Sequence, residues 1–502
     1  MARLVAVIPA GMVPRREVRG NVTMSDRSVA GTTTSTGSGR GAWTAELRTT
    51  LRLAGPLIVV QLGQVGMNTV DTVMVGPLGP DSLAAAGVAS AVYILVTLVC
   101  TGTIIGMTPL VSQAFGRGDT ERCDQILGQG LLLAVLLSLP VAWLFGYGEP
   151  ILRWLGQTPV VAELGGAYLG ALAWSVTPFL LFMAFRQYLE GTSVTRPSMV
   201  ITLFGLGVNV IANRAFIYGV DGVIPAMGVE GTGWATTVVR WSMLVAMIGY
   251  YVARHTERGR RLSWLRLRPD RAILAAVVTV GIPVGIQLGL EVGIFSLAAV
   301  MMGWFGAVEL AAHQITINIA TTTFMVAMGT SMAGSIRVGQ HLGAERVEAV
   351  RHAVAATFVV AVGFMACCGL AFVVAPAALI GIYSQDPGVI AVGSHLLLFA
   401  AIFQIFDGAQ VAGNSVLRGA ADTRVPMLVS VLGYWIVALP IAYVLGIREG
   451  LGATGVWTGL AIGLAVVAVL LSLRVWQVLW SGTPAVQMAI TKPARPEPDA
   501  AA

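Results

Sequence analysis

Long apolar segments recur along the chain at regular intervals, with short polar loops between them. Each segment is close to the roughly 20 residues that a helix needs to cross a ~30 Å hydrocarbon core. We expect twelve membrane-spanning helices, at 51–76, 82–110, 125–147, 162–188, 198–220, 229–253, 272–303, 308–336, 352–383, 388–417, 425–447 and 452–477. The pattern therefore predicts an all-α integral membrane protein.

The composition agrees with lipid as the main solvent. Hydrophobic residues make up 56% of the 502 residues and charged residues only 11%, whereas soluble domains carry about 25% charged residues. The net charge of +6 is not the footprint of nucleic-acid binding, because no soluble segment is long enough to form a basic module. The four cysteines have the spacing of neither a disulfide pair nor a metal site, and we expect them to be packing residues.

Arginines are distributed unevenly among the loops. Alternate loops carry Arg117, Arg122, Arg196, seven arginines between 254 and 271, and then Arg346, Arg351 and Arg424, whereas the opposite loops carry only Arg153 and Arg448. By the positive-inside rule the arginine-rich side is cytoplasmic, and an even number of spans places both termini there. We therefore predict a multi-pass protein of the cell's inner, or plasma, membrane.

The chain repeats itself at a nearly constant offset. Pro56 and Pro283, Gly76 and Gly303, Gln113 and Gln340, and Gly116 and Gly343 are each 227 residues apart, and Gly191 and Gly419 are 228 apart. This offset contains six spans, an even number, so the two halves have the same orientation and are related by an axis along the membrane normal. We predict two pseudo-symmetric six-helix lobes with a cleft between them.

The repeat defines the domain organisation. We expect an N-terminal lobe at 43–254 and a C-terminal lobe at 272–478. A cytoplasmic linker at 255–271 joins them, and its Trp264 with alternating leucines and arginines is typical either of an interfacial helix or of a plain solvated linker. The polar segment 1–42 is expected to be a disordered cytoplasmic tail, and 479–502 a second cytoplasmic tail.

Three acidic residues lie inside predicted spans: Asp71 in span 1, Glu291 in span 7 and Asp407 in span 10. An ionisable side chain inside a bilayer is costly and usually faces the protein interior, where it marks a pathway. Amide side chains accompany the acids at helical spacing, and the supporting candidates are Asn68, Asn209, Asn213, Gln287 and Gln410. Amide side chains without an acid nearby can equally well form hydrogen bonds between helices.

Such oxygen clusters suit two coupling ions. Carboxylate and amide oxygens are ligands for hard cations, so Na⁺ can bind there, and no other metal is expected. A carboxyl group in a low-dielectric site can also carry a proton. The repeat places Ala298 where Asp71 would recur, and Gln64 where Glu291 would recur. We therefore expect each lobe to have its own cation or proton site.

Four segments together resemble a known family. They are Val70-Asp71-Thr72-Val73-Met74-Val75-Gly76, Ala311-Ala312-His313-Gln314, Ser335-Ile336-Arg337-Val338-Gly339, and Gln410 through Leu417-Arg418-Gly419. They are similar to motifs of multidrug and toxic compound extrusion transporters, with the NorM-type bacterial branch closest. The resemblance implies a cation-coupled exporter of amphipathic, often cationic compounds, with two six-helix bundles forming a V. It also matches family acids to Asp71, Glu291 and Asp407, and family asparagines to Asn209 and Asn213.

The chain departs from the family pattern at two positions. Phe403 stands one turn before Asp407, where some members have a tyrosine, and Arg214 stands where a neutral residue is expected and would disfavour a cation nearby. We predict a secondary antiporter that needs no cofactor, uses Na⁺ or H⁺ as coupling ion, contacts membrane lipids and functions as a monomer. The alternatives are a flippase or exporter of a lipid-linked or metabolite substrate and, less favoured, an intramembrane enzyme, for which no histidine pairs convincingly with a nucleophile.

Overall fold

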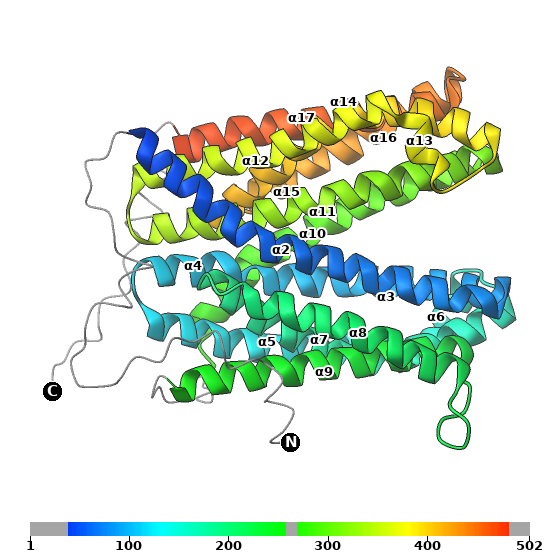
Figure 1. Cartoon of the computed structure of the whole chain (residues 1–502), viewed down its shortest axis with the longest axis horizontal. Coiled ribbons are helices and arrows are strands. Elements are labelled where there is room, and N and C mark those ends of the chain that lie inside the picture. Colours follow the sequence, from blue (N-terminus) through cyan, green and yellow to red (C-terminus); the bar gives the residue numbers. More distant parts are fainter. Residues whose placement is uncertain (1–38, 258–268, 481–502) are drawn as a thin grey trace. The chain divides into compact units, whose positions relative to one another are not determined.

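The computed structural model describes residues 39–257 and 269–480, and in these ranges twelve helical spans are long and apolar enough to cross a membrane (Figure 1). The predicted number of spans is thus confirmed. The spans are α2 (Gly39–Val75), α3 with α4 (Pro80–Ile105 and Met107–Gly116), α5 (Thr120–Phe145), α7 (Pro159–Gly191), α8 (Arg196–Tyr218), α9 (Gly228–Glu257), α10 (Arg271–Gly303), α11 (Ala307–Gly343), α12 (Val347–Val374), α14 (Pro387–Gly419), α15 and its continuation (Arg424–Arg448), and α17 (Gly452–Val475).

The predicted ninth span, 352–383, is wrong at its C-terminal end. Helix α12 stops at Val374, Ala375 has φ −137° and ψ 49°, and a separate short helix α13 (Pro376–Gly381) follows. Proline lacks the N–H that would continue α12, but it fits the first turn of a new helix. The sequence also gave no sign of the short helix α6 (Gly148–Trp154). Of the predicted tails, residues 1–38 and 481–502 lie outside the described residues, as does the linker segment 258–268 with Trp264. The predicted boundary of the first tail is wrong at its end, because residues 39–42 already belong to α2, and residues 479–480 end the last helix.

Two hydrophobic cores correspond to the two halves of the repeat. One gathers buried side chains between Met67 and Tyr251, and the other gathers buried side chains between Ile294 and Leu479. Figure 1 shows the corresponding helices as two bundles, with α3, α5, α7, α8 and α9 in one and α12, α14 and α17 in the other. These bundles are the N-terminal and C-terminal lobes below.

The first helix of each repeat also packs on the other lobe. The early part of α2 places Leu53, Ala54 and Leu57 in a small apolar cluster with Ala333 and Ile336 of α11. Figure 1 shows α2 running obliquely from one bundle to the other. The early part of α10 likewise contributes Ile273 and Val277 to the core of the N-terminal lobe. Each lobe is therefore completed by a helix of the other half.

Reciprocal hydrogen bonds join the lobes near the arginine-rich loops. The Gln113 side-chain amide donates to the Gly419 carbonyl at 3.1 Å, and the Gln340 side-chain amide donates to the Gly191 carbonyl at 3.0 Å. The two glutamines are repeat equivalents, and so are the two glycines. The internal symmetry of the sequence is thus expressed as a pair of equivalent contacts across the interface.

Glycines allow the helix backbones to approach closely at this interface. A Cβ atom on Gly116 would overlap the backbone of Gln340, and one on Gly343 would overlap the backbone of Gln113. A Cβ atom on Gly102 would in the same way overlap Gly285. Small residues at helix contacts permit the close packing that stabilises helix association in membranes.

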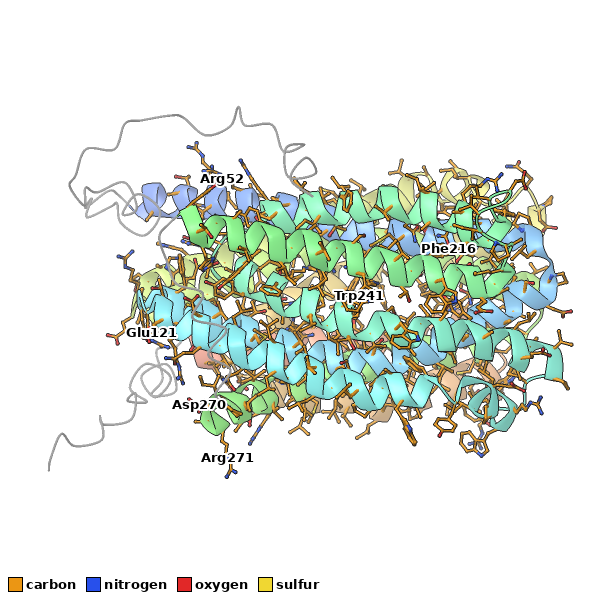
Figure 2. The ribbon with its side chains drawn as sticks, turned by 90° about the horizontal axis from the view of Figure 1, so that it is seen from below. Arg52, Glu121, Phe216, Trp241, Asp270 and Arg271 are labelled. Carbon is orange, nitrogen blue, oxygen red and sulfur yellow. The ribbon has the colours of Figure 1, made fainter. Side chains whose placement is uncertain are left out.

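An ion pair adds an asymmetric contact between α2 and α11. Arg337 donates from Nε and from a terminal nitrogen to the two oxygens of Glu46, both at 2.7 Å, and His341 Nε2 lies 3.1 Å from the same carboxylate. The Glu46 side chain is only 9% exposed and that of Arg337 16% exposed. Figure 2 shows other charged residues, Arg52 and Glu121 among them, at the same end of the helices.

We predict that Glu46→Gln loosens the contact between α2 and α11. Loss of one partner leaves the other charge poorly compensated, and breaking a buried pair costs about 3–5 kcal/mol. Spin labels at the repeat-equivalent exposed positions 121 and 348, in a chain without its native cysteines, report the distance between the lobes. Pulsed electron resonance should show a longer or broader distance distribution in Glu46→Gln.

Two further variants sharpen this measurement. The double variant Glu46→Gln with Arg337→Met removes both charges and should recover much of the wild-type distribution. Glu149→Gln removes an exposed pair with Arg153 and should leave the distribution unchanged. An unaltered distribution in Glu46→Gln would show that the ion pair does not hold the lobes together.

Candidate functional site

The N-terminal lobe surrounds Asp71 with amide donors. Asp71 lies in the second half of α2, and the side-chain nitrogens of Asn209 and Asn213 on α8 donate to its Oδ1 at 2.9 and 2.6 Å. Both asparagines are buried. They stand four residues apart on one face of α8, so both reach the same carboxylate oxygen. The structure thus brings together three of the four polar residues that the sequence suggested for this lobe.

The same asparagines keep unused acceptors in the site. Their Oδ1 atoms are buried and have no hydrogen-bond partner within the described part of the chain. A carboxylate beside free amide oxygens can receive a proton or another donor that enters the lobe. The N-terminal lobe therefore has one acid with a preformed set of polar neighbours.

Two other polar residues on α2, one of them the candidate Asn68, lie away from Asp71. Asn68 is exposed, so it lies apart from the two asparagines that hold Asp71. Gln61 accepts a hydrogen bond from Arg186 at 3.1 Å, and Arg186 is ion-paired with Glu190 at 2.6 Å. Both members of that pair are buried. The polar face of α2 thus serves two different clusters.

Arg240 on α9 is a neighbour of Asp71 that the sequence analysis missed. Its guanidinium carbon lies 4.4 Å above the centre of the Phe179 ring, and its charge interacts with that of Asp71. The sequence does set Arg240 apart, because it is the tenth residue after Glu230 and the span has no other charged residue before Arg254. Arg214, which was expected to affect the site, is exposed and lies over the Tyr218 ring.

The C-terminal lobe brings two acids together. Glu291 on α10 and Asp407 on α14 interact electrostatically, and Asp407 is only 5% exposed. Gln410, one turn after Asp407, lies beside Glu291. Arg418, near the end of α14, supplies the positive charge that acts on Glu291. Arg418 was noted in the sequence only as part of a motif.

Several oxygens of this lobe remain without partners among the described residues. They are Gln404 Oε1, Gln410 Oε1, Asn414 Oδ1 and the Tyr434 hydroxyl. Gln404 does use its nitrogen, which donates to Thr323 at 2.5 Å, and Gln287 is buried one turn before Glu291. Unpartnered buried oxygens around two acids form the type of surroundings that attract a hard cation or a proton.

Two nearby groups have structural roles. His313 is buried, and its Nδ1 accepts a hydrogen bond from the Trp457 indole at 3.2 Å. Phe403 packs edge-on against Phe295 with ring centroids 6.0 Å apart. In the described residues no group of three or more His, Cys, Asp or Glu side chains is arranged to hold a metal ion.

Comparisons with known proteins agree with this architecture. The chain is 37% identical over 439 residues to a probable multidrug resistance protein NorM of Mesorhizobium japonicum, covering 86% of this chain and 94% of that protein. It is 36% identical to the multidrug resistance protein PmpM of Pseudomonas aeruginosa, covering 86% and 91%. These relatives are named as drug-resistance proteins, and not as enzymes.

Solved structures and a family model complete the comparison. The fold matches the Vibrio cholerae MATE transporter VcmN with a TM-score of 0.80 at 19% identity, covering 88% of this chain and 99% of that chain. The MatE family model matches twice, at residues 56–214 and 283–444, and the two matches begin 227 residues apart. That offset equals the internal repeat. The chain therefore belongs to the MatE family of membrane transporters.

Proposed function

We propose that this protein exports amphipathic, often cationic compounds in exchange for inward-moving Na⁺ or H⁺. The observation that carries the proposal is the presence of two separate acid sites inside the membrane spans, Asp71 in one lobe and Glu291 with Asp407 in the other. Acids at such positions are costly in lipid and mark ion or substrate pathways. The drug-resistance names of the relatives support an organic substrate.

We further propose that the arginine-rich end is cytoplasmic, with both termini there, in the cell membrane. The inter-lobe contacts of Gln113, Gln340 and Glu46 then close the cytoplasmic side. Opening that side requires these contacts to separate, and an ion or substrate drives the change only if it prefers one of the two arrangements. Because one chain contains both lobes and both acid sites, it functions as a monomer.

We predict that Glu291→Gln and Asp407→Asn each reduce ion-coupled efflux at least about tenfold, the effect of roughly 1.4 kcal/mol. Each change removes a charge from the C-terminal site but should not impair folding, because burying an amide is less costly than burying an acid. The measurement is uptake of a fluorescent cationic dye by inside-out vesicles, driven either by a Na⁺ gradient or by a pH gradient. The comparison of gradients also identifies the coupling ion.

The matched control for these variants is Glu309→Gln, which alters a partly exposed acid in the first turn of α11. All variants are compared at equal membrane levels of protein. Normal coupled uptake by both Glu291→Gln and Asp407→Asn would refute the role of the C-terminal site.

We also predict that the lobes are not interchangeable. Asp71→Asn should inactivate transport, and adding Ala298→Asp at the equivalent position should not restore it. Ala298 is 2% exposed in the apolar core of the C-terminal lobe, so a new acid there would cost about 2.5 kcal/mol or more and lower the membrane level. Dye efflux per unit of membrane protein measures both variants. Recovery in the double variant would show that the two halves are equivalent.

A further inference from the structure

Arg240 occupies a costly position in the N-terminal lobe. It lies twelve residues after the start of α9, about 18 Å along the helix. Figure 2 shows its neighbour Trp241 midway along the helices. Two guanidinium nitrogens, Nε and one terminal nitrogen, are buried without a hydrogen-bond partner in the described residues. An arginine stays charged at all physiological pH values, so a compensating charge is needed nearby.

The groups around Arg240 identify this compensating charge. The ionisable groups near enough to act on the charge of Arg240 are Tyr93 on α3, Asp71 on α2 and Tyr168 on α7. The tyrosine hydroxyls are engaged with serines, Tyr93 with Ser175 and Tyr168 with Ser90, each at 3.3 Å. A tyrosine is neutral near pH 7. Asp71 is therefore the counter-ion of Arg240.

The two lobes differ in their balance of charge. The N-terminal site has one acid, Asp71, and one arginine. The C-terminal site has two acids, Glu291 and Asp407, and one arginine, Arg418. With all acids ionised, the first site is neutral and the second keeps one negative charge. Only the second gains Coulomb energy from a bound monovalent cation.

We propose that Arg240 is a specificity-determining residue, which reserves Asp71 for a proton by excluding Na⁺ and cationic substrates from the N-terminal site. A proton differs from these cations because it bonds covalently to a carboxylate oxygen and needs no additional ligands. When Asp71 accepts a proton from water, Arg240 loses its counter-ion and the site becomes positive. This inference deepens the proposed function and rests on it.

The test measures Na⁺ binding to the purified chain in lipid nanodiscs with radioactive ²²Na⁺. The background is Asp407→Asn, which removes the C-terminal site as a source of signal. In this background Arg240→Gln should bind Na⁺ at least about tenfold more tightly, corresponding to roughly 1.4 kcal/mol. The gain should disappear when Asp71→Asn is added, because the new Na⁺ ion would be bound by that carboxylate.

Further variants distinguish charge from side-chain size. Arg240→Lys keeps the positive charge and should show no gain. Arg240→Met removes the charge but keeps a long apolar stem, so it should show the same gain as Arg240→Gln. Arg214→Gln removes an exposed arginine on α8 and is the matched control without a gain.

Two results would overturn the proposal. One is the absence of Na⁺ binding in both neutral Arg240 variants when they are folded, as judged by a single thermal unfolding transition. The other is Na⁺ binding that depends on Asp71 while Arg240 is present. Because the readout is binding and not transport, this experiment can fail while coupled dye efflux succeeds, and the reverse also holds.

Discussion

Polar groups inside a bilayer must find their partners within the protein, because the hydrocarbon offers none. This constraint explains the helical spans, and it also explains where the charges lie. Asp71 has two amide donors and an arginine, and Glu46 has a bidentate arginine. Each charged cluster therefore ties together helices that are distant in the sequence. The polar sites hold helices together, and they are also candidate ion sites.

The contact between the lobes depends on a second constraint, the small size of glycine. Lipid provides little hydrophobic drive for helices to associate, so close packing and hydrogen bonds must supply it. Gly116 and Gly343 bring backbones near enough for Gln113 and Gln340 to reach carbonyl groups across the interface. Within residues 39–257 and 269–480, the side chains of Gln113 and Gln340 form such bonds on this side of the lobes. Separating the lobes on this side would also have to break the apolar contacts of α2 with α11.

The sequence predicted features that depend on lipid depth and on duplication. Hydropathy located the twelve spans because each must match the membrane thickness, and the offset of 227 predicted the two lobes. The sequence also pointed to Asp71, Asn209 and Asn213, because acids and amides stand out against apolar neighbours. The structure places these three residues together. Arg214 was considered in the sequence but Arg240 was not, although Arg240 stands out equally against its apolar neighbours.

Other features could not be predicted because they depend on contacts between distant segments. Hydropathy reports how deep a residue lies, but not which helix it contacts. The crossing of α2 to α11 and the pairing of Glu46 with Arg337 join positions 291 residues apart. In the sequence, Gln113 matched only its repeat equivalent Gln340, and Gly191 matched only Gly419. Their reciprocal bonding required the relative placement of the lobes.

The reciprocal glutamine contacts have the pattern of an isologous dimer interface, in which the same patch on each partner meets the other about a two-fold axis. Here both partners belong to one polypeptide, so each copy of the patch has its own codons. A substitution at Gln113 affects one of the two equivalent bonds, whereas in a true homodimer it would affect both. The fused chain can therefore change one of the two equivalent contacts while the other stays as it was. The ion pair of Glu46 with Arg337 is an example of an asymmetric contact, which joins the halves in one direction and not in the other.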